Sequence, residues 1–158
     1  MMPNLETGRV TDRRPPFRYS ALARVSFSDT DAQGVVYYGR YLPYFDQARI
    51  EYHRHLGLLP LWHGPHQFVM RAFAIEYVAP ARFDDLLEVF TRTVRIGRTS
   101  VTAECLAVRV PDDVVMCTAR LTLVLVDTTT RRPVPVPADY RAAVRAFEGE
   151  AAEIEPLG

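Results

Sequence analysis

Two acidic residues stand just ahead of a glycine in the segment DTDAQGVVYYGRY, residues 29–41. A carboxylate can act on a carbonyl compound as a general base or as a nucleophile, and the oxyanion that forms then needs a hydrogen-bond donor. A strand that ends at Asp31, a bend at Gly34 and a helix that begins near Tyr41 would supply both groups. The N–H groups ahead of a helix lack intrahelical partners, and the helix dipole favours negative charge there. The segment thus offers the groups that carbonyl chemistry at Asp31 would need.

The same aspartate has a simpler interpretation. An aspartate before a glycine turn is commonly a turn-former, whose side chain accepts hydrogen bonds from nearby backbone N–H groups. Asp29 fits such a structural role, and we interpret it as a partner of the loop. The residue type of Asp31 alone favours the turn, whereas the surrounding motif, described below, favours catalysis.

All four histidines are close together in the sequence, which raises the alternative of a metal-dependent hydrolase. They are His53, His55, His63 and His66. His53 and His55 are two positions apart on a predicted helix and so point in different directions, and no H-E-x-x-H motif occurs. A serine hydrolase is disfavoured too, because there is no G-x-S-x-G motif and no evident base for Ser26 or Ser28. We therefore expect no metal ligands and no cofactor.

The apolar pattern predicts the elements that position these residues. Residues 19–28 alternate in hydropathy as a strand does. From residue 41 onward, apolar side chains recur every three or four positions, as on one face of a helix of about four turns. Pro43 suits the first turn of this helix, and Gly57 suits its end. The apolar stripe consists of Tyr41, Leu42, Phe45, Ala48, Tyr52 and Leu56.

Strands with a period of two follow the helix. They are predicted at residues 67–78, 86–96, 100–110 and 114–126, and in the first of them Val69, Phe73, Ile75 and Tyr77 are expected on one face. We expect these strands to form a four-stranded antiparallel meander, within one sheet that wraps on the helix. A short helix is predicted at residues 139–147. Residues 18–148 are expected to form one α+β domain, with a flexible N-terminal tail at 1–17 and a C-terminal tail at 149–158.

The composition limits the possible partners and surroundings. The chain of 158 residues carries 19 basic and 19 acidic residues, and its pI near 6.9 leaves no global field to hold a nucleic acid. No apolar stretch reaches the ~18 residues of a membrane helix, and the N-terminus lacks the apolar middle of a signal peptide. We expect a cytoplasmic protein without a membrane partner. Cys105 and Cys117 suggest buried thiols, although sequence does not exclude a disulfide.

Two stretches of the sequence resemble one known family. They are RVSFSDTDAQGVVYYGRYLPYFDQARIEYHRHLG, residues 24–57, and IEYVAPARFDDLLEV, residues 75–89. Both are similar to the hotdog-fold acyl-CoA thioesterases of the 4-hydroxybenzoyl-CoA thioesterase and YbgC type. The resemblance implies a single-domain hotdog fold, in which an antiparallel β-sheet wraps around one long central α-helix. It also implies hydrolysis of an acyl-CoA to a free acid and CoA by a homo-oligomer, either a dimer or a tetramer.

The resemblance assigns roles to individual residues. It implies that Asp31, the second acid of the D-x-D motif, is the general base or nucleophile, and that the backbone N–H of Tyr38 is the oxyanion donor. Substrate contacts are expected from the rest of the motif, namely Gly34, Val35, Val36, Tyr37, Arg40, Tyr41 and Phe45. The candidates for binding the CoA phosphates are Arg82, Arg95 and Arg98.

The sequence departs from the family at two of these positions. Many relatives carry His where this chain has Tyr38, and Asn or Ser where it has Arg40, so contacts through those side chains are changed here. Two other functions stay open. An acyl-carrier-protein thioesterase could use the same site, since either carrier presents a pantetheine arm, and a non-catalytic protein could bind an acyl ligand on the same fold.

Overall fold

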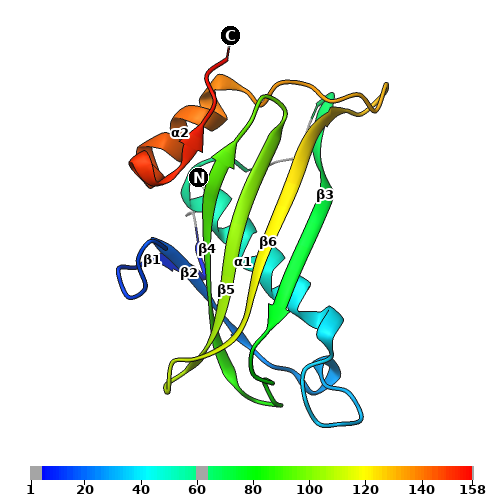
Figure 1. The fold of residues 1–158 in the computed structure, drawn as a ribbon, viewed down its shortest axis with the longest axis vertical. Coiled ribbons are helices and arrows are strands. Elements are labelled where there is room, and N and C mark those ends of the chain that lie inside the picture. The colour runs from blue at the N-terminus through cyan, green and yellow to red at the C-terminus, as the bar shows by residue number, and fades with distance from the viewer. Residues whose placement is uncertain (1–4, 60–63, 158) are drawn as a thin grey trace.

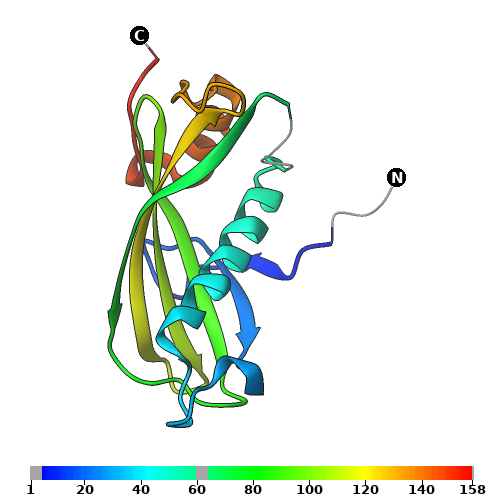
Figure 2. The same cartoon turned by 90° about the vertical axis from the view of Figure 1, so that its right-hand side faces the viewer.

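The centre of the structure is a seven-stranded sheet with one long helix lying across it (Figures 1 and 2). This computed structural model describes residues 5–59 and 64–157. The strands are β1 Gly8–Val10, β2 Tyr19–Arg24, β3 His66–Tyr77, β4 Leu86–Ile96, β5 Ser100–Val110, β6 Val114–Asp127 and β7 Glu153–Ile154. The order across the sheet is β1-β2-β4-β5-β6-β3, with antiparallel pairing, and β7 adds to β4 in parallel. The predicted antiparallel sheet around one long helix is thus confirmed.

The long helix is α1, Tyr41–His55, and it begins and ends where the sequence predicted. Its apolar face packs on the sheet and contains Tyr41, Tyr44, Phe45, Ala48 and Tyr52. Gly57 ends the helix in a left-handed conformation with φ +74°. The Gly57 N–H donates to the Arg54 carbonyl oxygen (3.1 Å) and the Leu58 N–H to that of His53 (2.9 Å), which together form a Schellman motif.

The prediction of a four-stranded meander is wrong for its first strand. β4, β5 and β6 do follow one another, but β3 pairs with β6 at the far edge of the sheet, and β4 pairs with β2. The connection between β3 and β4, residues 78–85, is too long for a tight hairpin and instead crosses the end of the sheet (Figure 2). On its way it meets the acidic motif, where the Val36 N–H donates to the Ala81 carbonyl oxygen at 2.8 Å.

A bulge changes which side chains of β3 face the core. The pairing with β6 shifts between Met70 and Ala72, so one extra residue separates the two halves of the strand. Phe68 lies opposite Leu125, Phe73 lies opposite Leu121, and both phenylalanines pack against the core clusters. The expectation that Val69 shares the face of Phe73 is therefore wrong, because strict alternation does not hold across a bulge.

Both segments expected to be tails contribute strands. β1 lies within residues 1–17 and pairs with β2, and β7 lies within residues 149–158 and pairs with β4. Arg9 and Arg13 each reach the buried Glu88 at 3.1 Å, which ties the N-terminal segment to the sheet. Strands of two or three residues have no sequence period of their own, and only tertiary pairing reveals them. The structure corrects the assignment of these segments, while the domain boundaries at 18 and 148 stay a prediction.

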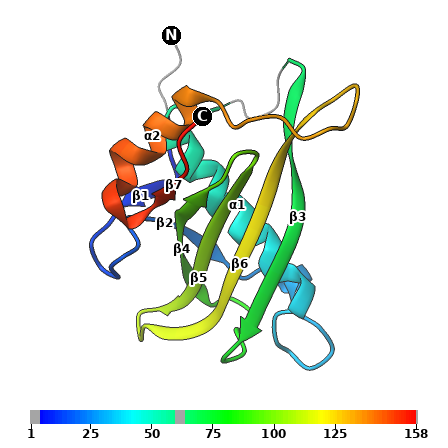
Figure 3. The ribbon, with the colours of Figure 1, turned by 45° about the horizontal axis from the view of Figure 1, so that its top comes forward.

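The second helix, α2 Ala138–Glu148, lies over the end of the sheet where α1 finishes (Figure 3). It confirms the predicted short helix at residues 139–147. Its apolar side chains Tyr140 and Val144 pack with Ile96 of β4 and Leu125 of β6 in a second core cluster. This packing leaves the opposite end of the sheet, where the acidic motif lies, uncovered by α2.

Two expectations about the chain as a whole can be compared with the structure. Cys105 and Cys117 are buried free thiols, as predicted. Within residues 5–59 and 64–157, neither helix combines the length and the apolar character needed to cross a bilayer.

Candidate active site

The acidic motif forms a tight turn that follows β2. Thr30 and Val36 make an isolated antiparallel bridge, and the turn lies between them. The Asp31 N–H donates to the Val35 carbonyl oxygen (2.9 Å), and the Gly34 N–H donates to the Asp31 carbonyl oxygen (3.0 Å). Gly34 has φ +78°, a conformation that a residue with a Cβ rarely adopts. The bend predicted at this glycine is thus present. Gly34 adopts a left-handed conformation there and returns the chain past Asp31.

The Asp31 carboxylate takes part in the turn through one of its oxygens. Oδ1 accepts a hydrogen bond from the Gln33 N–H at 2.8 Å, which is an Asx-turn. No donor from the described residues reaches Oδ2, and the side chain is half-buried. The turn-forming role of Asp31 is therefore present, and it leaves lone pairs of the carboxylate available for a second role.

Asp29 fastens the turn to α1. Its Oδ2 accepts hydrogen bonds from the Tyr44 hydroxyl (2.6 Å) and the Ser26 N–H (3.1 Å), and its Oδ1 lies 3.7 Å from Nε of Arg40. Burial and the bond to Asp29 both raise the pKa of Tyr44, so this hydroxyl remains a donor at neutral pH. Asp29 thus has the structural role that the sequence analysis gave it. It also forms an ion pair with Arg40, one of the predicted substrate contacts.

A short 3₁₀ turn, Tyr38–Arg40, leads from the motif into α1. Tyr38 is its first residue, and its N–H has no partner within the turn and donates to no described residue. The preceding Tyr37 N–H donates to the Asp29 carbonyl oxygen at 2.9 Å, which brings this turn beside the acid pair. The rings of Tyr37 and Tyr38 lie 4.3 Å apart, both partly exposed. A free donor thus stands at the start of a helix and close in the chain to the Asp31 carboxylate.

A hollow of about 310 Å³ opens beside this donor. Four predicted substrate or oxyanion residues border it, and four residues of the crossing connection and the end of β3 complete it. They are Val35, Val36, Tyr38 and Tyr41, with Tyr77, Val78, Ala79 and Pro80. The Tyr77 hydroxyl donates to the Tyr38 carbonyl oxygen at 2.7 Å. Sequence analysis missed residues 77–80, because only the crossing of residues 78–85 places them here.

Tyr41 forms part of the buried wall of the hollow. Its ring lies 5.8 Å from that of Tyr77, and its hydroxyl oxygen accepts a hydrogen bond from the Ala81 N–H at 3.3 Å. Burial raises the pKa of Tyr41, so the phenol is neutral at physiological pH. This part of the hollow is accordingly aromatic and uncharged.

Phe45 does not reach the hollow. Its side chain has no solvent exposure, and its ring packs 6.3 Å from that of Phe73 within the core beneath α1. The structure therefore assigns this aromatic side chain to the core, and its predicted contact with substrate has no support in the described packing.

The three arginines expected to bind CoA phosphates do not lie together. Arg82 is beside the motif turn, where it forms an isolated bridge with Val35. Arg95 is near the opposite end of β4 and Arg98 is in the turn beyond it, so with a rise of ~3.3 Å per residue roughly 30 Å separates them from Arg82. Arg95 also pairs with two acidic side chains of the C-terminal segment, at 3.5 and 3.4 Å. Only Arg82 is placed near the candidate site.

The histidines do not form a metal centre in the described part of the chain. Both ring nitrogens of His53 are engaged, with the Arg49 carbonyl oxygen and the Tyr140 hydroxyl, each at 2.7 Å. His55 lies 3.1 Å from a Glu6 carboxylate oxygen on the surface, and His63 lies outside the described residues. Among residues 5–59 and 64–157, no group of three His, Cys, Asp or Glu side chains could hold a metal ion.

His53 predicts a pH dependence of stability. Burial lowers the pKa of His53 from its ordinary value of 6.5 to about 4. The ring is therefore neutral in the folded protein, where it connects α1 to Tyr140 of α2. The unfolded chain binds this proton below pH 6.5 and the folded chain does not until about pH 4, so stability is full above 6.5 and decreases as the pH falls. We expect a loss of about 3 kcal/mol over this window, measured by urea unfolding. His53→Gln should show a shallower dependence, and parallel curves for parent and variant would contradict this origin.

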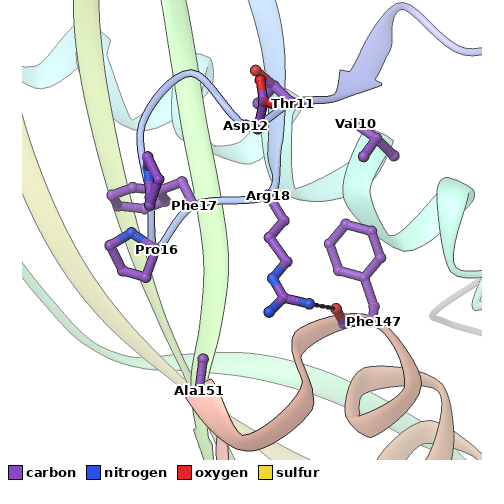
Figure 4. A pocket seen from close by; sticks show the side chains of 9 residues that line it. Val10, Thr11, Asp12, Pro16, Phe17, Arg18, Phe147 and Ala151 are labelled. Atoms are coloured by element: carbon purple, nitrogen blue, oxygen red, sulfur yellow. Dashed lines mark hydrogen bonds between the residues drawn. The ribbon is translucent and has the colours of Figure 1, made fainter.

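A larger hollow, of about 650 Å³, lies between the N-terminal segment and α2 (Figure 4). Its walls include Pro16, Phe17 and Phe147, and Arg18 crosses it to donate to the Phe147 carbonyl oxygen at 2.9 Å. None of the residues predicted to act in catalysis or to bind substrate lines this hollow. The smaller hollow, which four of those predicted residues line, is therefore the candidate active site.

Comparisons with known proteins bear on the family and the fold of the chain. A family model described as the thioesterase-like superfamily matches residues 25–144. The acyl-CoA thioesterase YbgC of Haemophilus influenzae is 34% identical over 128 residues, which are 79% of this chain and 93% of that protein.

Solved structures are similar as well. A thioesterase of Thermus thermophilus, complexed with coenzyme A and zinc, has a TM-score of 0.68 and 30% identity, covering 82% of this chain and 95% of that one. A member of the thioesterase superfamily from Jannaschia sp. CCS1 has a TM-score of 0.79 at 21% identity and covers 88% of each chain, which bears on the fold alone. Sequence family and fold agree, and the chain belongs to the thioesterase-like superfamily as a YbgC-type hotdog thioester hydrolase.

Proposed function

We propose that this protein hydrolyses an acyl-CoA thioester to a free acid and coenzyme A, using Asp31. The observation that carries the proposal is the half-buried Asp31 carboxylate, which has one oxygen unengaged by the described residues and lies in the turn that leads to the unpartnered N–H of Tyr38 and the hollow beside that residue. The names of the relatives support the substrate class, since the Haemophilus protein is an acyl-CoA thioesterase.

The reaction needs a base and an oxyanion donor. With the thioester oxygen at the Tyr38 N–H, a water molecule attacks the carbonyl carbon while Asp31 takes its proton. The tetrahedral oxyanion is stabilised by that N–H and by the positive end of the α1 dipole. As the oxyanion collapses, the carbon–sulfur bond breaks and the CoA thiolate recovers the proton from Asp31. Direct attack by Asp31 would form a mixed anhydride that water then hydrolyses, and the same groups serve either route.

The acyl group enters the hollow of Val35, Val36, Tyr38 and Tyr41, where aromatic and β-branched side chains favour an apolar occupant. We propose that the exposed residues Gly34, Tyr37 and Arg40 lie along its approach, because they neighbour the lining residues in the chain. Arg82 is the arginine we retain as a phosphate contact. The buried free thiols Cys105 and Cys117 support a cytoplasmic location, where thiols remain reduced.

Release of free thiol from a panel of short, long and aromatic acyl-CoAs, with matching acyl-carrier-protein thioesters, tests this function. Preferential hydrolysis of at least one acyl-CoA is the expected result. A strong preference for the carrier-protein thioesters would support the acyl-carrier-protein alternative. Tight acyl-CoA binding without hydrolysis would make this a non-catalytic binding protein.

We further propose that the protein is a homo-oligomer, a dimer or a tetramer. β3 is a twelve-residue strand at the edge of the sheet, and most of its side chains are only half-buried or exposed. An edge strand of this length presents unpaired N–H and C=O groups that a second copy could pair. Light scattering at micromolar concentration should therefore give at least twice the 18.0 kDa mass of the chain. A monomer that retains full activity would contradict this proposal.

A further inference from the structure

Two phenylalanines near the candidate active site are unusually exposed. Phe27 is 77% exposed and Phe83 is 56% exposed, whereas Phe45 and Phe90 are almost completely buried. Their rings lie 6.0 Å apart at an interplanar angle of 81°, an edge-to-face pair. Apolar side chains gathered on the surface mark binding sites more often than isolated ones do.

The two rings come from segments that are hydrogen-bonded to each other. The Val25 N–H donates to the Asp85 carbonyl oxygen (2.9 Å), and the Asp84 N–H donates to the Val25 carbonyl oxygen (3.0 Å). Phe27 begins the 3₁₀ turn Phe27–Asp29, and its carbonyl oxygen accepts hydrogen bonds from both the N–H (3.1 Å) and the hydroxyl (2.7 Å) of Thr30. The exposed pair is therefore held on a fixed backbone.

Each phenylalanine of the pair is close in the chain to a residue of the proposed catalytic turn or to one that pairs with it. The 3₁₀ turn that Phe27 begins ends at Asp29, two residues before Asp31. Phe83 directly follows Arg82, which bridges to Val35. Figure 2 shows the segment after β2 and the crossing connection meeting at one end of the sheet. A substrate whose thioester lies at Asp31 would thus have its carrier portion within reach of the pair.

A free cation accompanies the aromatic rings. The exposed Arg82 has no carboxylate partner among the described residues, and the nearby Asp85 carboxylate instead accepts a hydrogen bond from the Arg82 backbone N–H at 2.9 Å. Arg24 is a second exposed arginine on these segments, and it donates to the carbonyl oxygen of Asp84, the residue after Phe83, at 2.9 Å. Aromatic faces stack with a nucleobase, and a guanidinium binds phosphate oxygens. The chemistry of this surface is complementary to a nucleotide.

We propose that Phe27 and Phe83 bind the adenine of coenzyme A and that Arg82 binds its phosphates, while the pantetheine arm leads to Asp31. This inference rests on the proposed acyl-CoA thioesterase function. It also provides a reason for selecting coenzyme A over an acyl-carrier protein, because only the former carries the nucleotide.

The test compares one acyl group on two carriers, coenzyme A and pantetheine. Phe83→Ala and Phe27→Ala should each raise KM for the acyl-CoA roughly tenfold, by loss of stacking, and leave KM for the acyl-pantetheine within twofold. Arg82→Gln should behave in the same way. Arg132→Gln, which removes an exposed arginine from the loop before α2, is the matched control and should change neither KM.

Three results would overturn the inference. Equal rises in KM for both carriers would mean that the pair shapes the catalytic turn instead of binding the nucleotide. A lower mass of Phe83→Ala in light scattering would show that a second copy covers the pair. If the parent hydrolyses no thioester, the proposed thioesterase function is wrong, but nucleotide binding can still be tested separately. The test is calorimetric titration with adenosine 3′,5′-bisphosphate. Binding that Phe83→Ala weakens supports the inference, and absence of binding to the parent overturns it.

Discussion

Replacing Asp31 with asparagine is expected to lower kcat by roughly 10²–10⁴-fold, about 3–5 kcal/mol of barrier, while the fold survives. Asparagine keeps the side-chain oxygen that accepts the Gln33 N–H at 2.8 Å, so the Asx-turn persists. The substitution removes the negative charge and the basicity, and hence the capacity to activate water or to attack the carbonyl. KM should change much less than kcat, because other residues bind the substrate.

Asp29→Asn is the matched control, since it makes the same chemical change two positions earlier. Asp29 accepts hydrogen bonds from Tyr44 and Ser26 and lies beside Arg40, so its substitution should lower the unfolding temperature more than the rate of chemistry. Circular dichroism establishes that both variants fold, and thiol release measures the rates. If folded Asp31→Asn hydrolyses the best acyl-CoA within threefold of the parent, Asp31 is only a turn residue.

Phe45→Ala is expected to reduce the free energy of unfolding by about 3–5 kcal/mol. The side chain is completely buried between α1 and the sheet, and its removal leaves a cavity that the backbone cannot close. Because a domain of this kind is stable by only about 5–15 kcal/mol, the loss is a large share of the total. Urea unfolding followed by circular dichroism gives the value.

Phe45→Leu separates this core role from the substrate contact that the family resemblance implies. Leucine fills much of the same space, so we expect a smaller loss of stability and an unchanged KM. A raised KM in a stable Phe45→Leu, together with a mild effect of Phe45→Ala on unfolding, would show that Phe45 contacts the acyl group after all.

The crossing connection of residues 78–85 forms part of the candidate active site. Its Ala81 carbonyl oxygen accepts a hydrogen bond from the Val36 N–H, and its Arg82 pairs with Val35. Tyr77, just before the connection, donates its hydroxyl to the Tyr38 carbonyl oxygen. One side of the candidate site is therefore built by a segment about forty residues from the acidic motif in the sequence. Substitutions at Tyr77 or Ala81 would disturb the donor at Tyr38 without touching the motif.

Elements with a strong local period and a local signal at their ends could be predicted from the amino-acid sequence. The helix at Tyr41–His55 was predictable because its apolar spacing, Pro43 and Gly57 all agree, and each acts within a few residues. The hairpins from β4 to β6 have short turns that leave one choice of neighbour. The turn around Asp31 is local too, since it is closed by contacts between residues 29 and 37, whereas its catalytic role is implied by the family resemblance.

Features that depend on pairing between distant segments could not be predicted from the sequence. The position of β3 at the edge, the bulge after Met70 and the short strands β1 and β7 leave no period in the sequence, because each is set by the backbone it pairs with. The same holds for the arginines. Arg82, Arg95 and Arg98 are equivalent as residue types, but Arg82 precedes β4 and pairs with Val35, whereas the direction of β4 carries the other two to the opposite end of the sheet.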